Sequence, residues 1–496
     1  MRLILLFVII SVIPNIYSQD TILSLKNHNV NQAITKLKND KDLKNASIGF
    51  LAKDINTGEI IVANNPNLSM MPASTQKIIT TATALELLGA NYRFSTILQY
   101  SGTIDTNSRV LNGNIYIKGG ADPTLGSEYF YKSKKNEFLK SWTKSIAELK
   151  IDSVQGSIIA DASKYSNEIA CPKWAWEDVG NYYGTGANAL SVFDNLYELH
   201  LKSSKLADTL TTITFIDPEI PGLTIHNEVL SSNISSDEAF IFGAPYQYLH
   251  EVRGTIPKGQ ADYVIKGAIP DPAYFLAWKL QNELKESNIK CKGQIYTTRE
   301  LKLNNDTLNE QRHNIHIFYS PYLSEIITVT NKKSINLFAE HLLHEIGFVA
   351  NKIGSYSSGI EAIYDFWKLK GMDTDGFYYF DGCGLSRTNS ITPNQMVFVL
   401  TYMKTRSKNF ETFYRTLPVA GESGTLSSVG KNTSAKGIVH AKSGSIGRVR
   451  AYTGYVTTKS GRELAFCMNI ANYNCSSGEM RKKLEELMVA LADFNL

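Results

Sequence analysis

The spacing of apolar residues changes twice along the chain, and this change restricts its possible folds most. From about residue 92 to 310, short stretches of alternating apolar and polar residues, such as Asn114–Lys118 and Thr211–Phe215, lie between clusters of Gly, Asn, Asp and Ser. Alternation with a period of two, bounded by such turn residues, is typical of β-strands. The pattern predicts a strand-rich region with one clear helix at about 272–287, and the length of 496 residues allows two to four domains.

Helical periodicity is stronger on both sides of this region. Before it, residues 48–62 predict a hairpin around Asn56-Thr57-Gly58, and a helix is expected to end at Leu88, before Gly89. After it, helices are predicted at about 321–331, 336–348, 357–370 and 393–405. Three antiparallel strands are expected within 437–470, followed by a C-terminal helix at about 477–494.

Composition excludes several classes of protein. A hydrophobic fraction of 43% with 20% charged residues is in the ordinary globular range, and a net charge of +4 gives no electrostatic reason to expect a nucleic-acid partner. Five scattered cysteines are too few for a disulfide framework, and no C-x-x-C pair indicates a zinc ribbon or a thioredoxin-like site. Cys467 and Cys475 are close enough in sequence to pair.

The first 18 residues have the pattern of a signal peptide. Arg2 is followed by an apolar run from Leu3 to Ile13, and Ser18 offers a small residue at a cleavage point before Gln19. The run is too short to span a bilayer, and no other stretch reaches the length of a membrane-spanning helix. We therefore expect an exported, periplasmic protein without a transmembrane segment.

Residues 74–77 form an S-x-x-K motif at the start of a predicted helix. A serine hydroxyl is a weak nucleophile at neutral pH and needs a base within hydrogen-bond reach. Lys77 lies on the same helix face as Ser74, and the pKa of a lysine falls when it is desolvated or lies near a second cation. Free backbone N–H groups at the helix start can stabilise an oxyanion. Alone, however, this motif is common in long chains.

Two further motifs follow in order. Ser334-Ile-Asn336 lies on a predicted loop between helices, and Lys442-Ser443-Gly444 ends a predicted strand. Penicillin-binding proteins and class A β-lactamases share the set S-x-x-K, S-D-N and K-T-G. Here Ile replaces Asp in the second motif and Ser replaces Thr in the third, so the reactive groups are kept. Together, the three motifs predict one acyl-transfer site.

Over nearly all of its mature length the sequence resembles the low-molecular-mass class C penicillin-binding proteins, which are penicillin-binding-protein-4-type D-alanyl-D-alanine carboxypeptidase/endopeptidases. The family usually has Ser at position 383 and Thr at position 443, where this chain has Cys and Ser. The longer strings that carry the resemblance are Gly119-Gly-Ala-Asp-Pro-Thr-Leu125, Trp174-Ala-Trp-Glu-Asp-Val-Gly-Asn-Tyr-Tyr-Gly184, Asp381-Gly-Cys-Gly-Leu-Ser-Arg387, Leu417-Pro-Val-Ala-Gly421 and Gly424-Thr-Leu426.

The resemblance implies a fold and a domain organisation. The expected fold class is α/β (α+β), with a serine β-lactamase/transpeptidase-like domain in which helices flank an antiparallel sheet. This catalytic domain is expected to be split between residues 19–91 and 311–496. Residues 92–310 fit a large strand-rich insertion of one or two accessory domains, because the separation of Ser74 from Ser334 far exceeds what a β-lactamase needs.

The resemblance also supports roles for the catalytic residues. Ser74 would attack the carbonyl between two D-alanines, with Lys77 as its base. Ser334 would relay a proton to the leaving amine. Asn336 would orient Lys77 and hold the backbone amide of the substrate.

The remaining motif residues are expected to bind the substrate. Lys442 would attract the terminal carboxylate as a point charge, and Ser443 would donate a hydrogen bond to it. Gly444 belongs to the same substrate-binding segment. The backbone N–H groups of Ser74 and Ser445 would form the oxyanion hole.

The predicted protein is an exported serine DD-peptidase that acts on peptidoglycan stem peptides as a carboxypeptidase, an endopeptidase or both. By similarity, Asp178 and Arg387 would grip the side chain of the stem peptide. β-Lactam antibiotics are the expected covalent inhibitors, and no cofactor, metal ion or nucleic acid is expected. Two alternatives are a β-lactamase with the same acylation step and a non-catalytic penicillin- or peptidoglycan-binding protein.

Two other patterns have simpler interpretations. The string Glu340-His-Leu-Leu-His-Glu345 matches neither H-E-x-x-H nor H-x-x-E-H, so we expect its histidines to lie on a helix surface rather than to bind zinc. Four aromatic residues are expected to pack in a core or between domains rather than to stack on sugars: Trp174, Trp176, Tyr182 and Tyr183.

Overall fold

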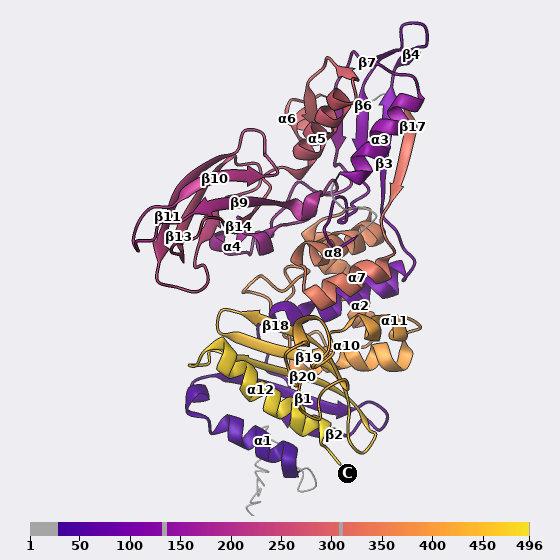
Figure 1. The fold of residues 1–496 in the computed structure, drawn as a ribbon. Helices are drawn as coiled ribbons and strands as arrows, with labels where there is room; N and C mark the ends of the chain where they lie inside the picture. The colour runs from indigo at the N-terminus through magenta and orange to yellow at the C-terminus, as the bar shows by residue number, and fades with distance from the viewer. Residues whose placement is uncertain (1–27, 131–135, 307–310, 496) are drawn as a thin grey trace, which may run out of the picture.

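A computed structural model describes residues 28–130, 136–306 and 311–495 (Figure 1). The predicted signal peptide, residues 1–18, lies outside these ranges. Across the described residues, none of the helices combines the length and the apolar composition needed to cross a membrane.

A five-stranded antiparallel sheet forms the centre of the part drawn at the bottom of Figure 1, with the strand order β18-β19-β20-β1-β2. The predicted hairpin is confirmed, because β1 pairs with β2 and places Phe50 opposite Asn64. The three strands predicted near the C-terminus are also confirmed as consecutive antiparallel partners. The strands are β1 (Ser47–Asp54), β2 (Ile60–Asn64), β18 (Val439–Ile446), β19 (Val449–Thr457) and β20 (Glu463–Ala471).

Helices cover both faces of this sheet. Two of them, α1 (His28–Lys38) and α12 (Ser477–Ala492), pack on each other and share an apolar core with one face. The other face packs against α10, which contacts α2, and the helical layer continues through α8. The helices on this side are α2 (Lys77–Leu88), α7 (Leu323–Lys333), α8 (Asn336–Asn351), α9 (Tyr356–Leu369), α10 (Pro393–Arg406) and α11 (Phe410–Thr416).

Between α2 and α7 the chain forms a separate strand-rich part, drawn at the top of Figure 1. One sheet has the order β16-β8-β6-β3-β17 and a second has the order β15-β7-β5-β4. The strands are β3 (Ser95–Ser101), β4 (Thr103–Asp105), β5 (Val110–Asn112), β6 (Ile115–Lys118), β7 (Ser153–Val154), β8 (Ile158–Asp161), β15 (Lys290–Cys291), β16 (Ile295–Thr297) and β17 (Arg312–Tyr319). The helices are α3 (Glu137–Glu148), α5 (Pro272–Glu286) and α6 (Thr298–Leu303).

A lobe projects sideways from this part, on the left of Figure 1. It contains two three-stranded sheets, ordered β10-β9-β14 and β11-β13-β12. The short helix α4 (Trp176–Val179) packs on β12 and leads toward the catalytic part. The strands are β9 (Leu196–Lys202), β10 (Thr212–Asp217), β11 (Thr224–Ser232), β12 (Phe240–Phe242), β13 (Leu249–Pro257) and β14 (Tyr263–Ala268).

The structure differs from the sequence-based expectations at three places. Strand β17 pairs with β3 of the strand-rich part, although the catalytic domain was expected to resume at residue 311. The helix α3 was not anticipated, although Phe138, Trp142 and Ile146 bury one face of it. All five cysteines are free, so the Cys467–Cys475 pair does not form.

The histidines of α8 were expected on a surface, and this prediction was wrong. His341 and His344 are fully buried where α8 meets the inserted part. The ring of His341 donates through Nδ1 to the carbonyl oxygen of Ala121 (2.9 Å) and accepts through Nε2 from Ser191 (2.8 Å). Burial lowers the pKa of His341 to about 3, so its ring stays neutral. The two hydrogen bonds of His341 therefore fix α8 to the insertion.

A buried carboxylate strengthens the same contact. Glu345 of α8 accepts a hydrogen bond from Lys164 Nζ (2.8 Å) and another from the hydroxyl of Tyr165 (2.9 Å). The hydroxyl of Tyr92 donates a further hydrogen bond. Because Lys164 and Tyr165 follow β8, this carboxylate ties the insertion to the helix that begins at Asn336.

Candidate active site

The S-x-x-K motif lies where a 3-10 turn, Ala73–Gln76, leads into α2. Ala73 has a φ of 48°, a left-handed conformation that is uncommon outside glycine, directly before Ser74. Lys77 is fully buried, and its Nζ lies 3.0 Å from Ser74 Oγ. The structure therefore brings the predicted nucleophile and base into contact.

Two acceptors complete the surroundings of the amine. Lys77 Nζ lies 2.7 Å from Oδ1 of Asn336 and 2.9 Å from the carbonyl oxygen of Cys383. Burial lowers the pKa of Lys77, and the opposing effects of nearby acidic groups are smaller. This lowering favours the neutral amine that a general base needs.

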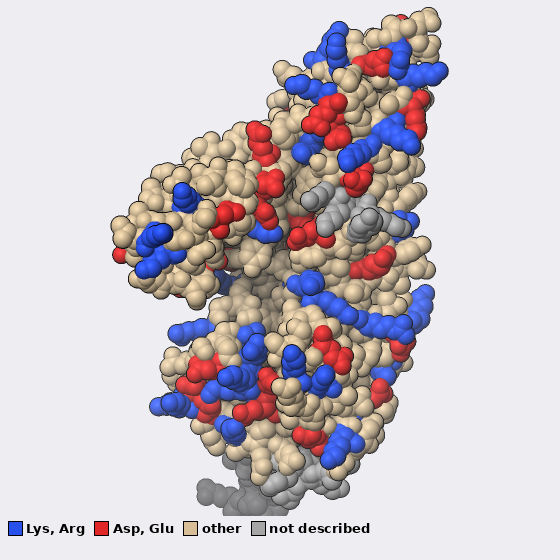
Figure 2. All heavy atoms as spheres, in the orientation of Figure 1, with Lys and Arg blue, Asp and Glu red and all other residues tan. Residues whose placement is uncertain are grey.

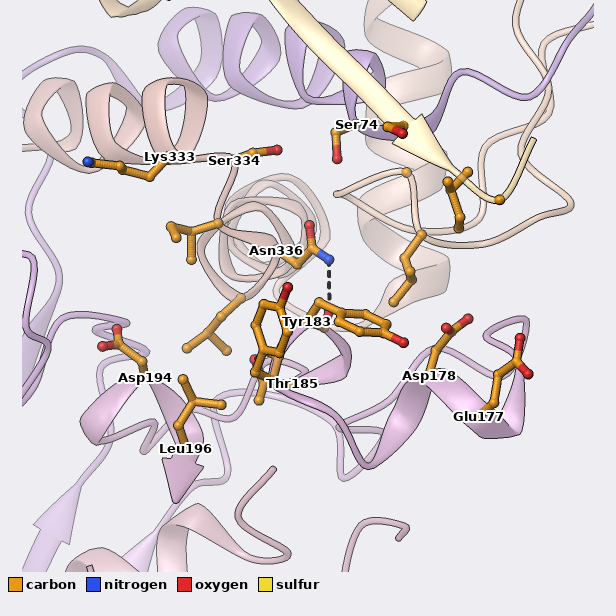
Figure 3. Close-up of a pocket in the computed structure, with 18 of the residues that line it drawn as sticks. Ser74, Glu177, Asp178, Tyr183, Thr185, Asp194, Leu196, Lys333, Ser334 and Asn336 are labelled. Atoms are coloured by element: carbon orange, nitrogen blue, oxygen red, sulfur yellow. Dashed lines mark hydrogen bonds between the residues drawn. The ribbon is translucent and has the colours of Figure 1, made fainter. Parts of the chain in front are cut away.

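The S-x-N motif occupies the junction of two helices. Ser334 has a φ of 62°, and this left-handed residue ends α7 and turns the chain into α8. Asn336 is the first residue of α8, and its Nδ2 donates to the carbonyl oxygen of Tyr183 at 2.7 Å. Figure 3 shows Ser74, Ser334 and Asn336 directed into one pocket from different elements. An atom of the insertion thus fixes the orientation of the Asn336 amide.

Lys442 approaches the same pocket from the edge strand β18. Its Nζ is fully buried and donates to Ser334 Oγ (2.9 Å) and to the carbonyl oxygen of Ser443 (2.7 Å). Burial, followed by the positive charge of Lys77, holds its pKa well below the usual range. Ser443 Oγ donates to Thr425 Oγ1 at 2.7 Å, within the Gly424–Leu426 string.

Strand β18 lies directly against the turn that carries Ser74. A Cβ added to Gly444 would lie 2.8 Å from the Pro72 carbonyl oxygen and 3.1 Å from Ser74 N, so only glycine permits this approach. The N–H of Ala441 points away from β19, toward the Pro418 carbonyl oxygen. Since N–H directions alternate along a strand, the N–H of Ser445 points to the same open side. It is therefore available to an oxyanion in the groove.

Six of the predicted residues line a groove with a volume of about 630 Å³: Ser74, Asp178, Ser334, Asn336, Arg387 and Ser445. Figure 2 shows the surface hollowed between the lateral lobe and the catalytic part, with Lys, Arg, Asp and Glu interspersed on the face drawn. The groove is lined by residues of both parts, among them Ser74, Tyr129, Asp178, Tyr182, Tyr183, Asp194, Lys333, Ser334, Asn336, Arg387 and Ser445.

Asp178 and Arg387 lie together at one end of this groove. Their nearest charged atoms are 3.8 Å apart, while Arg387 makes a closer ion pair of 2.6 Å with Glu177. Burial raises the pKa of Asp178, and the positive charge of Arg387 opposes this effect. Sequence reasoning missed Glu177, although it is adjacent to Asp178 in the quoted string.

The four aromatic residues have different environments. Trp174 is buried, and its Nε1 donates to Asp381 Oδ2 at 2.8 Å, as expected of a packing residue. Trp176 and Tyr182 are mostly exposed, so the packing prediction was wrong for them. Tyr183 lines the groove, which its neighbour Tyr182 also contacts.

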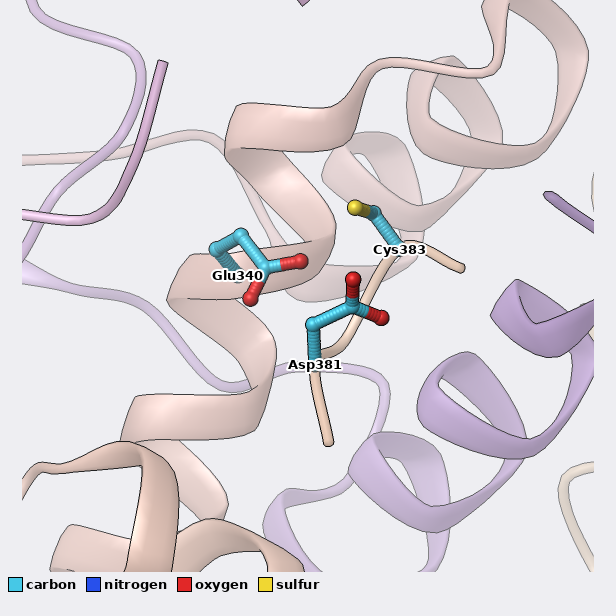
Figure 4. A group of neighbouring side chains, drawn as sticks. All are labelled: Glu340, Asp381 and Cys383. Carbon is cyan, nitrogen blue, oxygen red and sulfur yellow. The ribbon is translucent and has the colours of Figure 1, made fainter. Parts of the chain in front are cut away.

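Glu340, Asp381 and Cys383 form a buried cluster behind Lys77 (Figure 4), with one potential ligand atom of each within 4.8 Å of the others. Asp381 already accepts five hydrogen bonds from N–H groups, so its carboxylate has no free position for a metal ion. The donors are Gln76 Nε2, Gly384 N and Asn389 Nδ2 to Oδ1, and Trp174 Nε1 and Ser386 N to Oδ2. The cluster therefore fits a hydrogen-bonded support better than a metal site.

Residues 30–494 match the model of the D-Ala-D-Ala carboxypeptidase 3 (S13) family. The chain belongs to this family. The S13 family assignment confirms the predicted family and the predicted class of enzyme, a serine peptidase of the D-alanyl-D-alanine carboxypeptidase type.

Known relatives align with this chain over almost its whole length. D-alanyl-D-alanine carboxypeptidase DacB of Haemophilus influenzae is 25% identical over 469 residues, which cover 91% of this chain and 90% of the relative. The D-alanyl-D-alanine carboxypeptidase of Actinomadura sp. (strain R39) is 26% identical over 488 residues, covering 93% and 85%. The crystal structure of penicillin binding protein 4 from Haemophilus influenzae superimposes with a TM-score of 0.80 at 23% identity, covering 94% and 100%. This superposition confirms the predicted fold class.

Proposed function

We propose that this S13 protein is an exported serine DD-peptidase that hydrolyses D-alanyl-D-alanine or cross-link bonds of peptidoglycan stem peptides. The observation that carries the proposal is the contact of Ser74 Oγ with the buried amine of Lys77, which in turn contacts Asn336. Family membership supports the reaction class, and the complex of the Haemophilus influenzae structure with a β-lactam supports the binding of β-lactam antibiotics.

Acylation begins at the hydroxyl of Ser74. The neutral amine of Lys77 accepts the proton while Oγ bonds to the carbonyl carbon of the penultimate D-alanine. The N–H groups of Ser74 and Ser445 stabilise the oxyanion, and the loss of one such donor commonly costs about 3–4 kcal/mol.

The leaving amine then departs with a proton delivered through Ser334. The contact between Lys442 Nζ and Ser334 Oγ supplies this hydroxyl with a donor, so Ser334 can give its own proton to the amine. The C–N bond breaks, D-alanine or the amine of a cross-link leaves, and an ester remains on Ser74. The proton that Lys77 took from Ser74 replaces the one lost by Ser334, so Lys77 is neutral again before water attacks the ester. Water hydrolyses the ester and returns the proton to Ser74 Oγ.

Strand β18 and the groove wall bind the rest of the substrate. Lys442 and Ser443 bind the terminal carboxylate, with Gly444 keeping the strand close to Ser74. Asp178 and Arg387 bind polar groups of the stem-peptide side chain. The pattern of residues 1–18 supports export to the periplasm.

Mass spectrometry of purified muropeptides before and after incubation with the protein tests the proposal. Loss of one alanine from pentapeptide stems is expected for carboxypeptidase action, and conversion of cross-linked dimers to monomers is expected for endopeptidase action. Stoichiometric penicillin labelling with neither product would favour the binding-protein alternative. Rapid multiple turnover of a chromogenic cephalosporin would favour the β-lactamase alternative.

A further inference from the structure

Glu340 is a buried acid that the mechanism above does not use. It lies one helical turn after Asn336 on α8 and is fully buried. Its Oε2 accepts a hydrogen bond from Gly382 N at 3.0 Å, whereas Oε1 has no N–H or O–H partner among the described residues, and the weakly donating thiol of Cys383 is the further hydrogen-bond partner of the carboxyl group. Figure 4 shows its carboxyl group directed toward Asp381 and Cys383. A carboxylate left in this state would be costly, since a buried charge requires full compensation.

The neighbouring Asp381 explains how Glu340 avoids that cost. Five N–H donors surround Asp381, which therefore holds the negative charge of this cluster. Two ionised carboxylates this close together in a dry interior repel each other. Burial, with the charge of Asp381 as the next cause, raises the pKa of Glu340 to about 8. Glu340 is thus the neutral member of the pair at neutral pH.

A single loop connects Glu340 to the catalytic amine. Gly382 N donates to Glu340, and the carbonyl oxygen of the next residue, Cys383, accepts from Lys77 Nζ. The backbone that contacts Lys77 is therefore held on its other side by Glu340. Ionised Glu340 and protonated Lys77 attract each other across this loop.

This attraction influences which of the two groups, Glu340 or Lys77, carries the proton. Neutral Glu340 with neutral Lys77 contains the same number of protons as ionised Glu340 with an ammonium at Lys77. Only the first arrangement provides a base for Ser74. Any stabilisation of the second arrangement lowers the population of neutral Lys77, and therefore the rate of acylation, without changing the total charge.

We propose that Glu340 is a positioning residue for Lys77: as a neutral acid it holds the 382–383 backbone against the amine and leaves Lys77 free to accept the proton of Ser74. This inference deepens the proposed function and depends on it. It extends the active site to a side chain that touches neither substrate nor Ser74.

The groups that face Glu340 are consistent with this role. On α2 the facing group is Lys77, and on the loop after residue 380 they are Asp381 and Cys383. The insertion contributes Cys171, α9 contributes Tyr356, and Tyr379 precedes the loop. Burial raises the pKa of each of these last three groups, which therefore remain neutral. Lys77 is the basic group among them.

The test is the pH dependence of acylation in the Glu340→Gln variant. Glutamine can still accept from Gly382 N and carries no charge, as neutral Glu340 does. Because Glu340 is already neutral over the acid limb, we expect the midpoint of this limb for the second-order rate constant of fluorescent-penicillin acylation to stay within about 0.2 pH units of wild type, with the plateau within about threefold. Glu340→Leu, which cannot accept from Gly382 N, should lower the plateau by about tenfold or more. The control is Glu345→Gln, which removes a buried acid from the same helix away from Lys77 and should leave the midpoint unchanged.

A midpoint at least about half a pH unit lower in Glu340→Gln would show an ionised Glu340 beside Lys77, and a wild-type plateau in Glu340→Leu would show that the residue does not position the amine; either result would overturn the inference. If wild type itself is not labelled at Ser74, the proposed function fails instead, so the two failures are distinguishable. A second measurement does not depend on the variant folding. In wild type carrying ¹³C-glutamate, the infrared spectrum at pH 7 should contain an isotope-shifted band of a protonated carboxylic acid that disappears near pH 10. Absence of this band at pH 7 would contradict a neutral Glu340.

Discussion

Lys77 Nζ and Asn336 Oδ1 lie 2.7 Å apart although 259 positions separate the two residues in the chain. The other end of the same amide is occupied, because Nδ2 donates to the Tyr183 carbonyl oxygen. An amide oriented in this way presents an acceptor without a negative charge to the catalytic amine. Asn336 therefore holds Lys77 in place while leaving it free to lose its proton.

The Asn336→Asp variant should test this arrangement. A carboxylate of the same shape would stabilise the ammonium form of Lys77 and face the Tyr183 carbonyl oxygen without a donor. We expect the rate of penicillin acylation at pH 7 to fall by about 100-fold or more. Asn351→Asp, at the exposed end of the same helix, is the matched control and should stay within about twofold. Equal rates in both variants would refute the role given to the amide.

Replacement of Ser74 by alanine should abolish covalent labelling by a fluorescent penicillin. The hydroxyl is the group that forms the ester, and no other serine contacts the amine of Lys77 among the hydrogen bonds of the described chain. Gel fluorescence of wild type and variant, with matched thermal unfolding curves, measures the effect. Labelling of Ser74→Ala at wild-type stoichiometry would disprove the assignment of the nucleophile.

The Lys442→Ala variant should distinguish carboxylate binding from a general effect on the site. Loss of the point charge is expected to weaken acylation by substrates with a terminal carboxylate more than acylation by an ester that lacks it. Because Lys442 also contacts Ser334, some loss on both substrates is expected. The ratio of the two kcat/KM values is the measurement, and an unchanged ratio would remove the proposed role in carboxylate binding.

Substitution of Glu345 by glutamine should destabilise the fold without altering a catalytic residue. The buried carboxylate accepts from Lys164, Tyr165 and Tyr92, and its loss leaves the largely buried amine of Lys164 without its acidic partner. We expect a loss of about 3 kcal/mol in the free energy of unfolding. Glu137→Gln, which breaks an exposed pair with Lys140, should change it by about 0.5 kcal/mol or less. Similar values for the two variants would contradict the importance of the buried contact.

The buried neutral ring of His341 predicts a pH-dependent cost of substitution. Its folded pKa of about 3 lies below the usual value of 6.5, so its contribution to stability is present above pH 6.5 and is lost as pH falls toward 3. The destabilisation caused by His341→Gln should therefore be about 2 kcal/mol smaller at pH 5 than at pH 7.5. Chemical denaturation at both pH values measures this difference, and a cost that does not vary with pH would contradict it.

The three catalytic motifs could be predicted because each is a short string on one local element. Ser74 and Lys77 need only a helical turn to meet, and Gly444 marks a close approach of backbone that no other residue allows. The helices and strands that carry the motifs also have clear periodicity, and their predicted bounds agree with the structure within a few residues.

The remaining parts of the site depend on contacts that leave no pattern in the sequence. The acceptors supplied by Tyr183 and Cys383 are backbone carbonyl groups, which every residue has. The histidines of α8 were assigned to a surface because their burial comes from the insertion rather than from their own helix. Strand β17 was separated from its partner β3 because antiparallel pairing over such a distance is set by topology and not by local residues.

The contact between Asn336 and Tyr183 means that the catalytic part is not a self-sufficient module. A shortened chain that joined residue 91 directly to residue 320 would retain every motif serine and lysine yet lose the carbonyl group that aligns the asparagine. It would also expose two histidines and a glutamate of α8 to water, on a face that now lies in a dry interior. Attempts to minimise this protein should therefore trim the lateral lobe and keep the segment around Tyr183.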